Sequence, residues 1–145
     1  IDKIGRKPLL VIGSVGMTFS LALLTYCFLT AGVDQNGNMA LLGFSGPLSV
    51  LGANMFIVFF AMTWGPVMWV MLGEMFNNRI RAVAIAVCGL AQWLANFLVT
   101  FTFPILSGSV GPGFTYALYT FFAFTSLFFV LKFIKETKQK SLEEM

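Results

Sequence analysis

The sequence contains no histidine, only two cysteines and few charged residues. The commonest metal ligand and the commonest general base are therefore both missing. Cys27 and Cys88 fall in different apolar segments, so the sequence predicts neither a disulfide nor a metal site. Asp, Glu, Lys and Arg make up 10% of the chain, against about 25% in a typical soluble domain. Because so little charge cannot cover a water-facing surface, we interpret the chain as an integral membrane protein.

Long apolar stretches are what the sequence has in abundance. Hydrophobic residues make up 58% of the 145 residues, and crossing a bilayer takes about 20 mostly apolar residues. Four stretches meet this requirement, at about 9–31, 47–72, 82–106 and 114–134. The predicted fold class is all-α integral membrane, with four transmembrane helices. Since the first residue is Ile1 and no signal peptide is visible, we expect a piece of a longer protein.

The positive charges predict how the helices cross the membrane. All nine Lys and Arg residues lie before the first stretch, between the second and third, or at the end of the fourth and after it. The two loops on the other side, VDQNGNM and SGSVGPG, contain none. The positive-inside rule then places both ends of this segment in the cytoplasm, including the tail 135–145. The net charge of +3 thus reflects topology, and nothing in it indicates nucleic-acid binding.

The second stretch contains an interruption, within WGPVMW at residues 64–69. Pro66 has no backbone N–H and bends a helix. Because Gly65 makes the backbone at the same place more flexible, we predict a hinge at these two residues. Trp69 lies one turn after Gly65 and therefore shares its face.

The third stretch has polar residues at helical spacing. Gly89, Gln92, Asn96 and Thr100 recur at steps of three and four, and Trp93 lies beside them. Gln92 falls ~16 Å into the helix, about halfway through a ~30 Å hydrocarbon core. Two interpretations are open, because the amides could hydrogen-bond a neighbouring helix or bind a polyhydroxylated solute. An amide both donates and accepts, as a sugar hydroxyl does.

Two tryptophans bear on that choice. Trp69 and Trp93 could anchor the helices at the headgroup level, but both lie too deep for this role. Their indoles could instead provide an apolar surface for the C–H face of a sugar. Their depth favours the sugar-binding interpretation.

Two further patterns predict packing. Gly13, Gly16 and Ser20 form a strip of small residues that allows close approach of another helix. Asn54 is a single amide that we expect to satisfy itself locally.

Charged residues gather at the cytoplasmic ends of the predicted helices. Glu74 and Arg81 bracket the loop EMFNNRIR, and DKIGRK and KETK lie on the same side. Arg81 on its own could simply anchor the topology, but acidic residues contribute little to topology. Together these clusters could form a latch that closes one conformation and opens in another.

Three motifs resemble those of a known family. DKIGRK at 2–7 resembles D-x-x-G-R-[RK], and WGPVMWVMLGEMF at 64–76 resembles G-P-x-x-W…E-x-F-P. The tail KETKQKSLEEM at 135–145 resembles P-E-T-K-G-x-[ST]-L-E-E. In this order and spacing they identify the chain as similar to the sugar porter family of the major facilitator superfamily, over essentially all of its length. Asn77, Lys135 and Gln139 depart from the family pattern. These departures affect the implied loop geometry and the latch, and not the residues in the middle of the membrane.

The resemblance implies a position and an activity. The chain would be helices nine to twelve, the last third of a twelve-helix transporter that moves a pentose or hexose, xylose- or glucose-like, across the bacterial inner membrane. Alternating access, proton-coupled symport and the absence of a cofactor or metal are implied as well. The implied sugar contacts are Gly65, Trp69, Gln92 and Trp93, with Asn96 close by, and the implied cytoplasmic charge network is Asp2, Arg6, Glu74, Arg81 and Glu136.

Other functions have less support in the sequence. A proton carrier needs an acidic group in the membrane, and apart from Glu74 at an inner end the four stretches contain none, so this group would lie in the missing helices. A small four-span scaffold or complex subunit is the alternative, and Ile1 as the first residue argues against it. A membrane enzyme lacks a nucleophile–base pair or a metal set.

Overall fold

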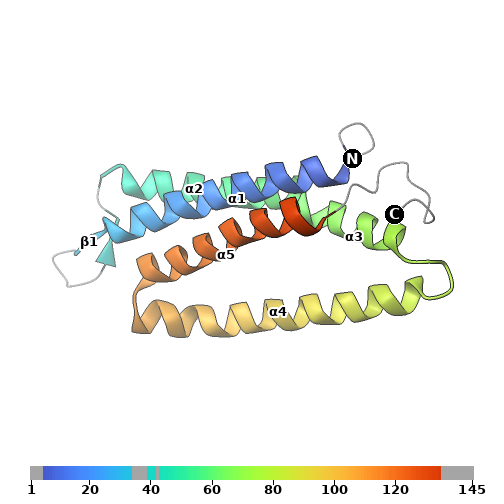
Figure 1. The fold of residues 1–145 in the computed structure, drawn as a ribbon. Coiled ribbons are helices and arrows are strands. Elements are labelled where there is room, and N and C mark those ends of the chain that lie inside the picture. The colour runs from blue at the N-terminus through green and yellow to red at the C-terminus, as the bar shows by residue number, and fades with distance from the viewer. Residues whose placement is uncertain (1–4, 34–38, 42, 135–145) are drawn as a thin grey trace.

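The computed structural model describes residues 5–33, 39–41 and 43–134 (Figure 1). Within them lie the helices α1 (Arg6–Leu29), α2 (Ser45–Met62), α3 (Trp64–Met75), α4 (Arg81–Ser109) and α5 (Pro112–Phe133). Four helical segments are long and apolar enough to cross a membrane, namely α1, α2 together with α3, α4 and α5. The four long apolar helices agree with the predicted all-α membrane fold.

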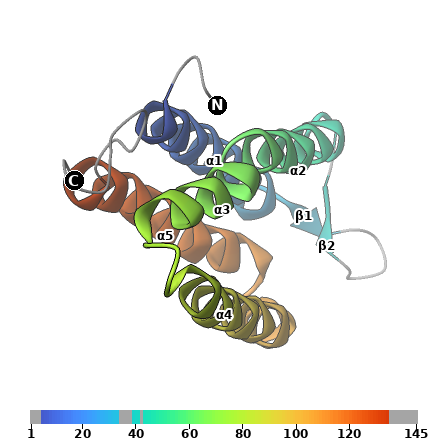
Figure 2. The same cartoon turned by 90° about the vertical axis from the view of Figure 1, so that its right-hand side faces the viewer.

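Helix α1 is the centre of the arrangement. It packs between α2 and α5, whereas α4 lies apart from α1 and α2 along one side (Figures 1 and 2). A small core of Leu10, Val67, Met71 and Val130 joins α1, α3 and α5 at one end. No residue of α4 is buried within the described chain. The structure is therefore a packed unit of α1, α2, α3 and α5 with α4 loosely attached.

The small residues of α1 form the predicted packing face. A Cβ on Gly13 would lie 1.9 Å from the Thr63 hydroxyl oxygen, and a Cβ on Gly16 would lie 2.4 Å from ring carbons of Phe59. Ser20 is fully buried on the same face. Only a residue without a side chain leaves room for such contacts, so the glycines set how closely α2 and α3 approach α1.

The two connections at the end far from the termini are short. Strands β1 (Gly32–Val33) and β2 (Met39–Ala40) pair antiparallel between α1 and α2, a feature that the sequence did not predict. Most of SGSVGPG, predicted as a loop, belongs to α4 or α5. Gly111 (φ 87°) reverses the chain between them, and Pro112 begins α5.

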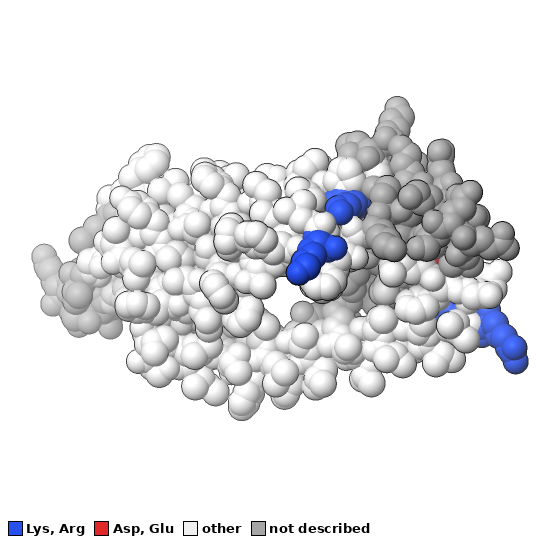
Figure 3. All heavy atoms as spheres, in the orientation of Figure 1, with Lys and Arg blue, Asp and Glu red and all other residues white. Residues whose placement is uncertain are grey.

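The described basic side chains gather toward the opposite end. They belong to the starts of α1 and α4, the loop before α4 and the end of α5, and Figure 3 displays those visible on one face in its right-hand half. No described residue in the connections β1–β2 and α4–α5 carries a charge.

Candidate functional site

The second apolar segment is interrupted at Thr63. Its backbone (φ −124°, ψ −85°) is not helical, and α3 begins at the next residue. Pro66 lies in the first turn of α3, where a helix does not need its N–H. The break therefore lies three residues upstream of the proline. A physical reason is that the proline ring crowds the carbonyl of the residue four positions earlier, Met62.

Trp69 reaches from α3 to α4. A Cβ on Gly89 would lie 3.5 Å from the end of its indole ring. Trp69 is 38% exposed, so the ring is partly covered and partly open. Trp69 thus lies over the first member of the polar stripe, one helical turn from Gln92.

The other stripe residues have different surroundings. The Gln92 side-chain oxygen is buried and has no hydrogen-bond partner within the described part of the chain. Trp93 is 72% exposed and Asn96 is also exposed. By helical spacing, all three project from the face of α4 that carries Gly89. The described helices therefore form one wall of the candidate site, with Trp69 on it and the other side open.

This wall has suitable chemistry for a neutral polar ligand. A buried amide oxygen without a donor is costly, and a ligand hydroxyl could satisfy it. The neighbouring indoles offer flat apolar faces. Among the described residues no group of three His, Cys, Asp or Glu side chains could hold a metal ion.

At the cytoplasmic end predicted from the charges, Arg6 and Glu74 form an ion pair between α1 and α3. The Arg6 side chain is 9% exposed and that of Glu74 31% exposed. The Nε–H of Arg81 donates a hydrogen bond to the carbonyl oxygen of Phe76 at 3.2 Å. Asp2 and Glu136, the other predicted members of the network, lie outside the described residues.

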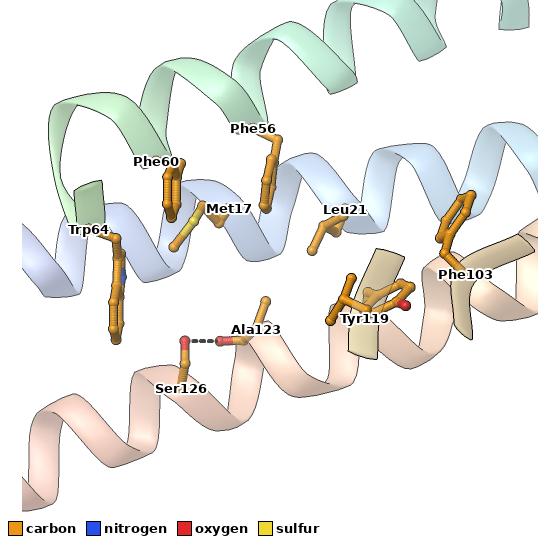
Figure 4. Close-up of a pocket in the computed structure, with 10 residues that line it drawn as sticks. Met17, Leu21, Phe56, Phe60, Trp64, Phe103, Tyr119, Ala123 and Ser126 are labelled. Atoms are coloured by element: carbon orange, nitrogen blue, oxygen red, sulfur yellow. Dashed lines mark hydrogen bonds between the residues drawn. The ribbon is translucent and has the colours of Figure 1, made fainter. Parts of the chain in front are cut away.

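Sequence reasoning missed a second feature, an open apolar cavity of about 410 Å³ (Figure 4). Its walls come from all five helices and include Met17, Phe56, Trp64, Phe103 and Tyr119. None of the predicted sugar contacts lines it, and its few polar groups do not suit a sugar. No pattern in the sequence indicated this cavity, because its lining residues lie far apart in the chain.

Comparison with known proteins identifies the class. The family described as "Sugar (and other) transporter" matches residues 1–145. The chain therefore belongs to this family, the sugar porters of the major facilitator superfamily. At the level of the family, its relatives are membrane transporters for sugars and not enzymes.

Particular relatives cover the whole chain. It is 49% identical to the "Glucose transport protein" of Synechocystis sp., over 100% of this chain and 31% of that protein. It is 38% identical to the "D-xylose-proton symporter" of Escherichia coli K12, over 100% of this chain and 28% of that protein. The chain thus spans about a third of the length of the curated relatives it matches.

Solved structures give the same result. The inward-open xylose transporter XylE from Escherichia coli matches with a TM-score of 0.82 and 39% identity, over 99% of this chain and 30% of that one. The XylE structure with bound 6-bromo-6-deoxy-D-glucose matches with a TM-score of 0.79 and 39% identity, over 99% of this chain and 29% of that one.

Proposed function

We propose that the whole protein containing this chain carries a monosaccharide, a pentose or hexose, across the membrane by alternating access. The relatives named for glucose and xylose support this substrate class. The observation that carries the proposal is the buried Gln92 oxygen, which has no partner within the described chain. Gln92 lies one helical turn from Gly89, the residue that the Trp69 indole covers. We assign the chain to the C-terminal third of the transporter, and we infer no enzymatic step for it.

In this proposal each predicted contact has its own role. Gln92 and Asn96 exchange hydrogen bonds with sugar hydroxyls, and Trp93 packs against the sugar ring. Trp69 covers the sugar from the cytoplasmic side. Gly65 and Pro66 allow α3, which carries Trp69, to change direction relative to α2. Helices from the rest of the protein would close the open side of the wall.

The charges at the cytoplasmic end would form the inner latch. Arg6 and Glu74 already pair in the structure, and Arg81, Asp2 and Glu136 would complete the network. Such a network closes the inner side in one conformation and separates in the other. The chain has no acidic residue within its apolar segments other than Glu74. If transport is coupled to protons, the titrating acid therefore belongs to the preceding helices.

We further propose that the protein lies in the bacterial inner membrane, with both ends of this segment in the cytoplasm. The distribution of Lys and Arg supports this orientation. The lipid bilayer and the preceding helices of the same protein are then its partners, and nucleic acid is not.

Replacing Gln92 tests the proposed site. In the full-length protein we expect Gln92→Ala to reduce uptake of labelled xylose and glucose to background while leaving its abundance in the membrane unchanged, because the sugar loses its amide partner. A panel of labelled sugars, assayed with and without a protonophore, would identify the substrate and the coupling.

Asn54→Ala provides the matched control. The Asn54 side chain donates to the carbonyl oxygen of Val50 at 2.8 Å, so this amide satisfies itself within α2, as predicted, and its loss should leave uptake intact. Normal uptake by Gln92→Ala would refute the binding role. A fall in abundance equal to the fall in uptake would favour the alternative, in which the amide joins helices.

A further inference from the structure

Helix α3 is attached to α1 at both of its ends. At the end next to the break, the Trp64 indole Nε1 donates to the Ser14 hydroxyl oxygen at 3.0 Å. At the other end, Glu74 pairs with Arg6. Between these points Val67 packs in the core that α1 and α3 share. The two helices therefore have two distinct polar attachments with an apolar contact between them.

The attachment at the break is largely buried, and Trp64 also borders the apolar cavity. Ser14 is fully buried, and Thr63 is only 4% exposed. The Thr63 side chain occupies the space that a Cβ on Gly13 would need, 1.9 Å from its hydroxyl oxygen. Ser126 of α5 approaches the Ser14 oxygen at 3.4 Å, and Figure 4 places Trp64 and Ser126 along the same cavity. Three helices thus meet where α3 begins.

The two attachments differ in the physical cost of opening them. Glu74 is 31% exposed and lies near the basic end of the structure, so water can reach its carboxylate when the Arg6–Glu74 pair separates. The Trp64–Ser14 bond borders the apolar cavity, where water does not replace the lost partner of the indole N–H. A movement of α3 will therefore open the charged end and keep the neutral end closed.

We propose that Trp64 is a positioning residue, and that the Trp64–Ser14 bond, with Thr63 against Gly13, is the pivot about which α3 turns when the Arg6–Glu74 pair opens. This inference rests on the proposed transport function. Helix α3 is about 18 Å long, so a tilt of about 10° at the pivot moves its far end by about 3 Å. The same tilt moves Trp69, near the middle of α3, by about 1 Å.

The test uses the full-length protein with Cys27 and Cys88 replaced by Ala. Spin labels at Pro8→Cys and Met75→Cys, two exposed positions near the inner ends of α1 and α3, report the distance between them. With the pivot intact we expect two resolved distances whose proportions change when sugar is added. Trp64→Phe keeps an aromatic ring but has no N–H, so we expect a single broad distribution and a three- to tenfold rise in the sugar KM.

Ser14→Ala removes the acceptor of the same hydrogen bond, and it replaces Trp64→Phe in the test if that variant does not fold. Because both variants remove one bond, the double variant should raise the KM no further than either alone. Thr25→Val is the matched control, since it removes a 3.1 Å hydroxyl contact between α1 and Thr120 of α5 that does not involve α3. This variant should keep both distances.

The outcomes separate the pivot from the proposed function. Two sharp distances in Trp64→Phe, or additive effects on the KM in the double variant, would overturn the pivot. If the parent protein still takes up sugar, the proposed transport function is not affected by that result. Absence of sugar uptake by the parent protein would overturn the transport function and the pivot with it.

Discussion

At the scale of single residues, glycine decides how closely α2 approaches α1. A Cβ on Gly16 would lie 2.4 Å from the Phe59 ring, which is closer than side-chain carbons pack. A Cβ on Gly108, in the last turn of α4, would meet nothing within 4 Å in the described chain. The same residue type therefore has a packing role in α1 and none in this part of α4.

This difference gives a prediction. In the full-length protein we expect Gly16→Ala to lower thermal stability in detergent, by about 1–3 kcal/mol, because the Phe59 ring must move. Gly108→Ala should leave stability unchanged or raise it slightly, since alanine favours helix. The melting temperature of each variant can be measured from the loss of monodisperse protein on heating. Equal melting temperatures for the two variants would show that Gly16 is not at a tight helix contact.

The site could be predicted in part at this scale. Helical spacing alone indicated that Gln92 and Gly89 share a face, and the structure adds that Trp69 lies on Gly89. The sequence could not reveal that Ser14 accepts a hydrogen bond from Trp64, because the two residues are 50 positions apart. Contacts of this kind depend on how the helices pack and leave no periodic pattern.

At the scale of elements, two prolines in apolar segments have different consequences. Pro66 follows a break in its segment, whereas α4 continues through Pro104. The sequence predicted an interruption at Gly65–Pro66, and the break lies at Thr63. The proline accounts for a break just upstream of it, and at this point the Thr63 side chain also packs against Gly13 of α1.

The ion pair between α1 and α3 yields a prediction at the same scale. In the full-length protein without native cysteines, Met71→Cys places a thiol in the core beside the pair. We expect Glu74→Gln to increase the rate at which a maleimide added from the cytoplasmic side labels this thiol, on the order of fivefold to a hundredfold. The reason is that a largely buried Arg6 loses its partner, which costs about 1–3 kcal/mol.

Two further variants complete this experiment. The double variant Arg6→Gln/Glu74→Gln should be labelled no faster than the single variants if the two charges act as one pair. Arg79→Gln, which removes an exposed charge at the same end, should leave the labelling rate unchanged. An equal increase for Arg79→Gln would mean that total charge, rather than this pair, keeps the inner end closed.

At the scale of the whole molecule, α4 is the least covered helix. It carries the polar stripe, yet none of its residues is buried in the described chain. Exposed aromatic residues such as Trp93, Phe97 and Phe101 lie along it. In the whole transporter that we propose, further helices would cover this surface and close the open side of the wall formed by α3 and α4.

Orientation in the membrane is testable at this scale. In intact cells we expect a membrane-impermeant maleimide to label Phe44→Cys, which lies before α2 and is 79% exposed. Asn78→Cys, between α3 and α4, should be labelled only after the cells are permeabilised, because the positive-inside rule predicts that this loop lies in the cytoplasm. The reverse pattern would contradict the proposed topology.

The sequence by itself determined the membrane class and the four apolar helices, because hydropathy and helical periodicity are local properties. The family motifs likewise depend on residue order alone. Only the tertiary structure decided which side chain packs at the break, which partner Arg6 takes and which groups meet at Ser14. Those features arise from contacts between residues far apart in the chain, and their energies depend on how closely the helices approach one another.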